Sequence, residues 1–350
     1  MIYQKFLRPV LFLFSPEKVH YFVVLLLQAV NAVPGVTKIL RNFYCVSDKS
    51  LERNVFGLKF DNPVGLAAGF DKNAEFYNEL SCFGFSFIEI GTVTPEPQPG
   101  NPKPRSFRLV KDKALINRMG INNQGARKIA QNIRKNSPNV IIGGNIGKNT
   151  LTPNDNAIDD YIQCFNVLNE VVDYFVVNIS CPNIGDIKKL QDIDILSDIL
   201  ISLKKLSSED PPEKRKPILL KISPDLNDQQ LDEVVEIALQ TGIDGMVATN
   251  TTLMRQNIRT DKTRLDSIGK GGLSGLPLRD RSTYIIKYLA KKLNGKIPVI
   301  GVGGIMSPED ALEKLNAGAS LIQIYTGFIY EGPQLVKKIN KAIMEESGSL

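Results

Sequence analysis

Eight short apolar runs, separated mostly by amphipathic helical sequence, constrain the fold of this chain more than any other feature. The runs are Pro63–Leu66, Phe87–Ile90, Val140–Asn145, Tyr174–Ile179, Ile218–Ile222, Gly245–Thr249, Pro298–Gly301 and Leu321–Tyr325. Runs of this length that alternate with helical segments such as Asp228–Gln240 and Pro308–Ala317 are typical of buried parallel strands. Eight such units predict an α/β chain whose sheet closes into a (β/α)8 barrel, the TIM barrel.

The remaining segments indicate how this barrel is extended. A chain of 350 residues can hold one barrel and an appendage. We expect residues 1–50 to form a helical extension and residues 51–350 the barrel. Val55–Leu58 predicts a short hairpin on the barrel floor. Gly91–Gly125 and Asn250–Leu276 are too long for a loop and a helix, and we expect them to build the rim of an active site.

Charge and cysteine content narrow the class of protein. The net charge is +6, and residues 1–50 hold six basic against two acidic side chains, a surplus of four positive charges. No run of Lys or Arg accompanies this surplus, so nucleic acid is not an expected partner. The four cysteines include no CxxC pair, which argues against a disulfide framework and a zinc site. We therefore expect a reducing compartment and no metal.

The first fifty residues contain two apolar stretches. In the first stretch, apolar side chains recur at helical spacing, with Lys5 and Arg8 on the other side. These apolar residues are Tyr3, Phe6, Leu7, Val10, Leu11 and Phe14. Pro9 predicts a kink or a division into shorter helices. Ser15 predicts the cap of a second helix, with Pro16 in its first turn, and this helix contains Tyr21–Leu27. Neither stretch reaches the ~20 apolar residues that a membrane span needs.

Three interpretations of this extension remain open. A secretory signal would use Lys5 and Arg8, the later apolar run and Val30-Asn31-Ala32 as its cleavage site. A plain helical cap over the barrel is the second. We favour the third, a helix pair in the membrane interface with its apolar face in the lipid and its basic residues at the headgroups.

Polar and glycine residues follow the predicted strands, where enzymes of this barrel type place their active sites. They are Ala68, Gly69, Phe70, Asp71, Lys72, Thr92, Asn145, Asn178, Cys181, Lys221, Thr249, Asn250, Thr251, Gly303, Gly304, Tyr325 and Thr326. A purely structural barrel would have turn residues there, but not two lysines and three amides. The set as a whole therefore predicts a binding site at this end of the barrel.

Two parts of this set predict a particular ligand. Gly301–Ile305 and Tyr325–Gly327 follow the seventh and eighth runs, where barrels bind phosphate through backbone N–H groups and a helix start. A bare turn is the alternative for these glycines. Lys221 is suited to stabilise negative charge on a reduced flavin ring. The alternative interpretation is that Lys221 only forms a salt bridge at the barrel rim. Lys72 is placed to pair with a substrate carboxylate.

The segment Asn178–Asn183 is the most specific for chemistry. Its two terminal amides suit an imide or carboxylate ligand, and a Cys181 thiolate can take a proton from carbon. The alternative for any cysteine is a small buried hydrophobe, and we assign Cys45, Cys82 and Cys164 to that role. The only histidine, His20, is expected to pack or to contact a ligand rather than to catalyse.

Three long stretches of the sequence are specific enough to compare with known families. They are NPVGLAAGFDKN at residues 62–73, GTVTPEPQPGN at 91–101 and NRMGINN at 117–123. These stretches resemble the dihydroorotate dehydrogenase family, and in particular its quinone-linked, membrane-associated class. The amino-terminal extension resembles that class too, because the soluble class lacks it. The likeness covers nearly the whole chain.

The resemblance implies a cofactor, a substrate and an oxidant. It implies that FMN is held by Ala68, Gly69, Thr92, Asn145, Asn178, Lys221, Thr249, Gly275, Gly304, Tyr325 and Thr326. It implies that dihydroorotate is held by Lys72, Asn117, Arg118, Met119, Gly120, Ile121, Asn178, Asn183, Asn250 and Thr251. A base then removes a C5 proton, hydride passes from C6 to flavin N5, and orotate forms for pyrimidine synthesis.

The class also implies where the oxidant enters. Quinone reoxidises the flavin from the side of the amino-terminal helices, with Arg108 at its headgroup. The protein is expected at the inner membrane, attached peripherally on the cytoplasmic side.

One residue departs from the class. Its base is typically serine, whereas this chain has Cys181, as the soluble class does. A thiol, with an ordinary pKa of about 8.5, ionises far more readily than an alcohol. Three alternatives stay open: a soluble-type enzyme that uses fumarate or a nicotinamide, a flavin- or phosphate-binding barrel that acts as an isomerase, and a non-catalytic scaffold at the membrane surface.

Overall fold

Eight parallel strands close into a barrel in the computed structural model, which describes residues 2–179 and 190–348. The strands are β3 (Val64–Leu66), β4 (Phe87–Val93), β7 (Ile141–Ile146), β8 (Tyr174–Asn178), β9 (Ile218–Ile222), β10 (Gly245–Ala248), β12 (Val299–Val302) and β13 (Leu321–Ile324). They are neighbours in this order, and β13 pairs with β3 to close the ring. Each strand overlaps one of the eight apolar runs, so the predicted barrel is confirmed.

Aromatic rings fill the amino-terminal end of the barrel interior. Alternate side chains of a barrel strand point inward, and Phe87 and Tyr174 belong to an inner apolar cluster that is separate from the core under the helices. A Cβ on Gly65 would lie 2.3 Å from the Phe87 ring, and a Cβ on Gly143 would lie 2.3 Å from the Tyr174 ring. These two positions therefore have to be glycine for the rings to fit.

A two-stranded hairpin covers the same end of the barrel. Strands β1 (Arg53–Val55) and β2 (Leu58–Phe60) pair in antiparallel fashion. Val55 and Phe60 join the inner apolar cluster, with Phe56 packed against it. The hairpin predicted at the barrel floor is therefore confirmed.

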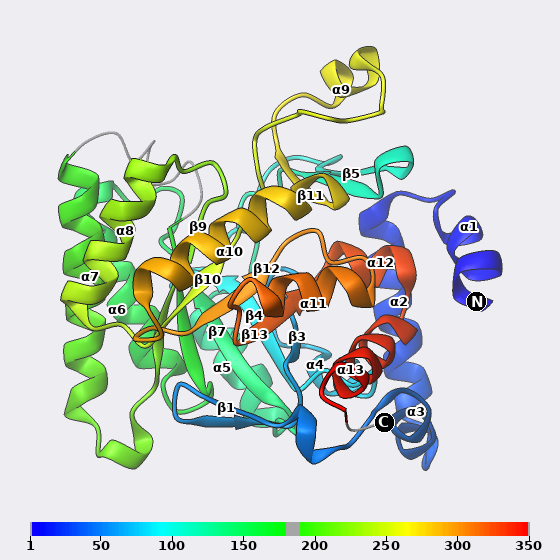
Figure 1. The fold of residues 1–350 in the computed structure, drawn as a ribbon, viewed down its shortest axis with the longest axis horizontal. Coiled ribbons are helices and arrows are strands. Elements are labelled where there is room, and N and C mark those ends of the chain that lie inside the picture. The colour runs from blue at the N-terminus through cyan, green and yellow to red at the C-terminus, as the bar shows by residue number, and fades with distance from the viewer. Residues whose placement is uncertain (1, 180–189, 349–350) are drawn as a thin grey trace.

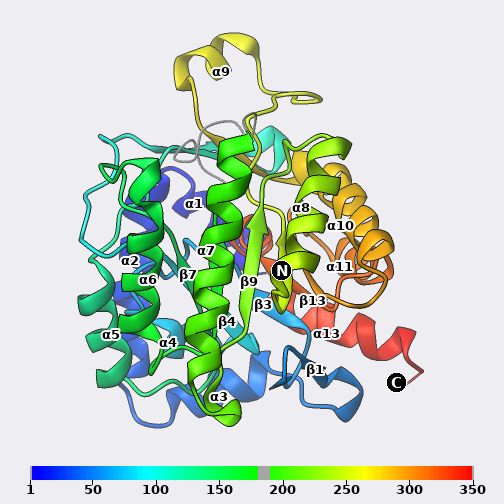
Figure 2. The ribbon, with the colours of Figure 1, turned by 90° about the vertical axis from the view of Figure 1, so that its left-hand side faces the viewer.

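Helices surround the barrel, as Figures 1 and 2 show. They are α4 (Tyr77–Ser81), α5 (Ala126–Lys135), α6 (Ala157–Leu168), α7 (Leu190–Glu209), α8 (Asp228–Thr241), α10 (Arg279–Leu293), α11 (Pro308–Asn316), α12 (Thr326–Glu331) and α13 (Gln334–Glu346). Single 3-10 turns occupy Lys49–Leu51, Val110–Asp112, Asn154–Asn156, Pro212–Lys214 and Leu276–Leu278. Outward strand residues such as Ile88 and Val177 pack into the core beneath the helices. The helices predicted over Asp228–Gln240 and Pro308–Ala317 are α8 and α11.

The two long insertions meet above the barrel mouth. Strands β5 (Ser106–Leu109) and β6 (Ala114–Asn117) come from the first insertion and β11 (Gly272–Gly275) from the second, and they form an antiparallel sheet in the order β11-β6-β5. The short helix α9 (Lys262–Ile268) stands out beyond this sheet in Figure 1. The insertions therefore build a rim, as predicted.

The amino-terminal segment forms a π-helix (Tyr3–Leu7), α1 (Arg8–Leu11), α2 (Pro16–Asn31) and α3 (Val36–Tyr44), which lie beside α12 and α13 (Figure 1). The helix start at Ser15 is confirmed, but the Ser15 side chain makes no capping hydrogen bond. Just before Pro9 the π-helix passes directly into α1 and the backbone stays helical, so the chain is not divided at that point. Arg8 Nη1 donates to the Tyr330 carbonyl over 2.9 Å. Arg8 therefore also holds this segment against the barrel.

Many apolar side chains of this segment face solvent. They include Phe6, Leu7, Val10, Leu13, Phe14, Tyr21, Phe22, Leu25, Leu26, Ile39 and Phe43, each more than half exposed. In the described part of the chain no single helix has the length and apolar content of a membrane span. Only α2 and α3 taken together meet that test, and they are bent by 114°.

Candidate active site

A cavity of about 2520 Å³ opens at the carboxyl ends of the barrel strands and continues between the rim sheet and the amino-terminal helices. Most of the predicted site residues that the structure describes line it, and they come from all parts of the chain. Cys181 and Asn183 lie outside the described residues.

Side chains from four strand ends form a hydrogen-bonded line across the barrel mouth. Asn250 Nδ2 donates to Asn178 Oδ1 over 3.3 Å, and Asn178 Nδ2 donates to Thr92 Oγ1 over 2.8 Å. Thr92 in turn donates to Asn145, whose Nδ2 donates to Glu89 Oε1 over 2.8 Å. Four residues that the sequence predicts separately therefore form one polar network.

Glu89 and Gln323 are site residues that the sequence analysis missed. Glu89 is fully buried in β4 and also accepts from Lys221 Nζ over 3.2 Å and from Gln323 Nε2 over 2.7 Å. Both residues interrupt apolar strand runs, and that interruption was the available signal. Lys221 is thus ion-paired, but it also lines the cavity. Lys221 therefore forms the salt bridge that one prediction gave it, and it also faces the cavity, as the other prediction requires.

A glycine-lined recess lies at the ends of β12 and β13. Gly304 has a φ of 76°, and a Cβ there would lie 2.3 Å from the Arg279 Cα, so only glycine fits without displacing the backbone. Ser274 and Thr326 share a hydrogen bond of 2.8 Å, which holds the end of β11 beside the start of α12. Gly275, Gly304, Tyr325 and Thr326 all line the cavity at this recess.

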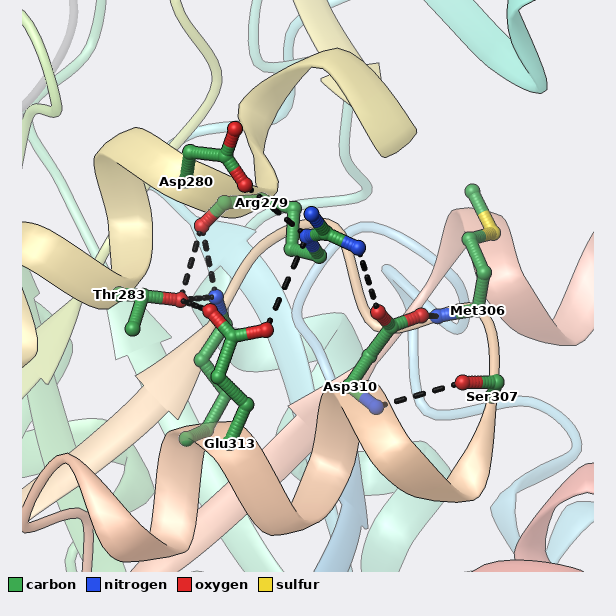
Figure 3. Close-up of polar contacts among 8 residues, drawn as sticks. Arg279, Asp280, Thr283, Met306, Ser307, Asp310 and Glu313 are labelled. Atoms are coloured by element: carbon green, nitrogen blue, oxygen red, sulfur yellow. Dashed lines mark hydrogen bonds and ion pairs between the residues drawn. The ribbon is translucent and has the colours of Figure 1, made fainter.

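Behind this recess a cluster of charged residues holds the loop after β12, as Figure 3 shows. Asp310 accepts the backbone N–H of Met306 over 2.9 Å and pairs with Arg279 Nη1 over 3.2 Å. Lys314 is fully buried and donates to the Arg279 carbonyl over 2.7 Å. Burial lowers the pKa of Lys314 to about 8, and the carboxylates of Glu313 and Asp310 oppose this shift. The cluster fixes the backbone beside Gly304.

Lys72 follows β3, the barrel neighbour of β13, and lines the cavity together with Ala68 and Gly69. Its ammonium donates to the Asn122 side chain. Burial and, secondarily, Arg105 lower the pKa of Lys72 to about 8, while Glu17 opposes the shift. The Tyr325 hydroxyl donates to the Gly69 carbonyl over 3.3 Å and ties this loop to the end of β13.

Residues 117–121 border the same part of the cavity, but Arg118 has partners of its own. Its guanidinium stacks on the Phe107 ring at 4.7 Å and donates to the carbonyls of Ile268 and Lys270. In this structure Arg118 therefore holds the carboxyl end of α9 to the rim sheet. Asn117, Met119, Gly120 and Ile121 also line the cavity, and Asn117 Nδ2 donates to the Gly272 carbonyl over 3.4 Å.

The loop after β10 supplies three more predicted residues. Thr249 N–H donates to the Val302 carbonyl over 2.9 Å, and Thr251 N–H donates to Asn250 Oδ1 over 2.7 Å. Asp225, which the sequence analysis did not select, accepts from the Leu253 N–H over 2.8 Å and from the Thr252 hydroxyl. This carboxylate fixes the loop that carries Asn250 and Thr251.

Toward the amino-terminal helices the cavity wall is apolar and includes His20 and Arg108. His20 packs edge-on against Phe70 and Phe76, at 5.2 and 5.6 Å. Burial, helped by the nearby Lys72, lowers its pKa to about 4. Arg108 stacks on the Phe12 ring at 4.4 Å and donates to the Phe14 carbonyl over 2.5 Å. His20 therefore packs against aromatic rings and also lines the cavity, in agreement with the prediction that it packs or contacts a ligand.

The three described cysteines are packing residues. Cys82 and Cys164 are buried and Cys45 is partly buried. Burial raises the pKa of each of these thiols. No group of three or more His, Cys, Asp or Glu among the described residues is placed to hold a metal ion.

Known proteins resemble this chain over nearly its full length. The family model of dihydroorotate dehydrogenase matches residues 50–346. Dihydroorotate dehydrogenase (quinone) of Christiangramia forsetii is 53% identical over 345 residues, 99% of each protein. The protein of the same name from Idiomarina loihiensis is 46% identical and covers 95% of this chain and 98% of its own length.

Solved structures agree with this likeness. The ligand-free dihydroorotate dehydrogenase of Eimeria tenella has a TM-score of 0.84 and 35% identity, and the match covers 96% of each chain. The complex of the Eimeria tenella protein with ferulenol has a TM-score of 0.79 and 35% identity, with 95% of this chain and 93% of that chain covered.

Proposed function

Because this chain belongs to the dihydroorotate dehydrogenase family, we propose that its barrel mouth holds FMN and dihydroorotate side by side and that a membrane quinone enters between the amino-terminal helices. The protein is a dihydroorotate dehydrogenase of the quinone-linked kind. It is a flavoprotein that oxidises dihydroorotate to orotate in pyrimidine biosynthesis.

The residues present fit a flavin that carries a single phosphate. The recess at Gly275, Gly304, Tyr325 and Thr326 offers backbone N–H groups and a hydroxyl, which suit a phosphate. The remaining cofactor residues line the mouth or lie just beneath it: Ala68, Gly69, Thr92, Asn145, Asn178, Lys221 and Thr249. Gln323 also lines the cavity, and its Nε2 donates to Glu89 over 2.7 Å. When bound, FMN supplies the acceptor for the hydride that leaves C6 of dihydroorotate.

The substrate is an anion, and the neighbouring residues suit it. The Lys72 ammonium would pair with the substrate carboxylate. Amide side chains of Asn117, Asn178, Asn183 and Asn250, together with Thr251 and the backbone of Met119, Gly120 and Ile121, would complete the pocket. Arg118 would act through its hold on α9 rather than through a direct contact, because its guanidinium is engaged by carbonyl groups.

Cys181 would take the C5 proton of dihydroorotate. This assignment comes from the sequence motif, since Cys181 lies outside the described residues. Replacement by Ala should leave orotate binding nearly intact and remove most flavin reduction, because the binding groups stay and the proton acceptor is lost. Replacement by Ser should keep some activity, with its pH dependence moved upward. Anaerobic flavin-reduction rates against pH would measure this, and a wild-type rate in the Ala variant would place the base elsewhere.

Residues 1–50 would form a separate functional part that attaches the enzyme to the cytoplasmic side of the inner membrane. The exposed apolar side chains of this segment support this proposal. The cavity also reaches the inner faces of its helices, which gives an apolar ligand a path from the lipid to the barrel mouth. Arg108, at this end of the cavity, would contact the quinone headgroup.

The observation that carries the proposal is the hydrogen-bonded line from Asn250 to Glu89 beside a glycine-lined phosphate recess. The test is a visible spectrum of the purified protein before and after anaerobic dihydroorotate. We expect a flavin spectrum that dihydroorotate bleaches and that a quinone restores. A colourless protein, or a flavin that recovers only with fumarate or a nicotinamide, would contradict the proposal.

A further inference from the structure

The side chain with the most unusual environment in the barrel is Glu89. It is a carboxylate with no exposed surface, at an inward position of β4, directly above the aromatic rings that fill the barrel floor. A buried carboxylate is costly unless it is paired and hydrogen-bonded. Glu89 meets that condition through donors from three other strands: Asn145 on β7, Lys221 on β9 and Gln323 on β13.

Glu89 itself stays behind the site. Lys221 and Gln323 line the cavity, whereas Glu89 and Asn145 do not. Only 5% of Lys221 is exposed, so its ammonium is held in a nearly water-free setting against one carboxylate oxygen at 3.2 Å. The position and the net charge at this point of the cavity wall are therefore set by the pair and not by Lys221 alone.

From this geometry we propose that Glu89 is a positioning residue that sets the reduction potential of the flavin through Lys221. The inference rests on the proposed function, because it assumes that the flavin ring lies against Lys221. A positive charge beside the ring favours its electron-rich reduced form. Glu89 cancels much of that charge, so the flavin is a weaker oxidant of dihydroorotate and a better donor to the quinone than Lys221 alone would make it.

Changing Glu89→Gln removes the charge and keeps the shape of the side chain. We expect this holoenzyme to favour the reduced flavin at least tenfold more than the wild type, a rise of about 30 mV for a two-electron couple. Lys221→Met should shift the ratio in the opposite direction. Glu89→Asp keeps the charge and should stay near the wild-type value. The measurement is the midpoint potential of the purified holoenzyme against equilibrating dyes, with the dissociation constant of FMN determined in parallel.

A charge-balanced double variant covers the possibility that Glu89→Gln fails to fold. Glu89→Gln combined with Lys221→Met removes both buried charges, so it should fold better than Glu89→Gln alone. Its potential should lie above that of Lys221→Met. A double variant with the potential of Lys221→Met would show that Glu89 has no effect on the flavin, and would overturn the inference.

Three further outcomes show whether this inference, the proposed function or both are wrong. If dihydroorotate bleaches the wild-type flavin but Glu89→Gln leaves the potential unchanged, only the role of Glu89 is wrong. Equal shifts in Glu89→Gln and Glu89→Asp would assign the effect to packing rather than charge, and would also overturn it. If the wild-type protein binds no FMN, the proposed function is wrong, and the inference is wrong with it.

Discussion

Lys72 illustrates how a single residue depends on its surroundings. Burial of its partly exposed side chain and, secondarily, the nearby cation Arg105 bring its pKa down to about 8. An anionic substrate that pairs with this ammonium needs it protonated. Binding is therefore coupled to pH in a range where an exposed lysine would not titrate.

We predict that orotate binds less tightly as the pH rises through about 8, because the free protein loses the Lys72 proton there. The dissociation constant should be flat below this pH and rise up to tenfold per pH unit above it. Titrating the purified protein with orotate at several pH values, and following the flavin spectrum, measures this dissociation constant. Lys72→Met should bind orotate weakly with no such slope, and a flat profile in the wild type would remove Lys72 from the carboxylate site.

At the scale of elements, α2 and α3 have two faces with different surroundings. Their inner residues, such as His20 and Leu27, line the cavity. Their outer residues Leu25 and Ile39, together with Leu13 between α1 and α2, are 65%, 66% and 81% exposed and do not line the cavity. The outer face can therefore be altered without changing the path to the barrel mouth.

We predict that serine at Leu13, Leu25 and Ile39 together reduces binding to anionic lipid vesicles by at least tenfold. Each aliphatic side chain that is buried in the lipid contributes roughly 1.5–3 kcal/mol to binding. The loss of three such side chains therefore weakens binding by more than tenfold, even if they insert only shallowly. Vesicle co-sedimentation measures it. The matched control is serine at Ile201 and Leu239, exposed apolar residues on α7 and α8 that should leave binding unchanged. Equal loss in both proteins would argue against docking through the amino-terminal face.

At the scale of the whole molecule, the barrel interior has two tiers. The lower tier is apolar and holds the rings of Phe87 and Tyr174 over Gly65 and Gly143. The upper tier is polar and carries Glu89 and its partners. The lower tier closes the barrel, and the upper tier becomes the floor of the site.

We predict that Gly143→Ala lowers the free energy of unfolding by about 1–3 kcal/mol or more, because the new methyl group would lie 2.3 Å from the Tyr174 ring. Thermal unfolding followed by circular dichroism measures it. Gly144→Ala is the control, since the adjacent residue points outward and its nearest neighbour atom is 3.2 Å away on Val172. Equal stability of the two variants would show that the barrel floor tolerates repacking.

Much of the fold and part of the site followed from the sequence. The eight strands, the hairpin and the rim insertions are local patterns, because apolar runs, helical periodicity and turn residues are read within a few positions. The strand-end rule then placed Thr92, Asn145, Asn178 and Asn250 in one site. Cys181 and Asn183 stay predictions from their motif.

What the sequence by itself determined is the barrel, the end that carries the site, and the family. The tertiary structure alone decided which charges meet. Glu89 and Lys221 are 132 positions apart, and Arg118 reaches carbonyls about 150 positions away. The physical reason is that such pairs depend on the stagger of the strands around the closed barrel and on the path of long insertions. Neither the stagger of the strands nor the path of a long insertion can be predicted from the local spacing of residues.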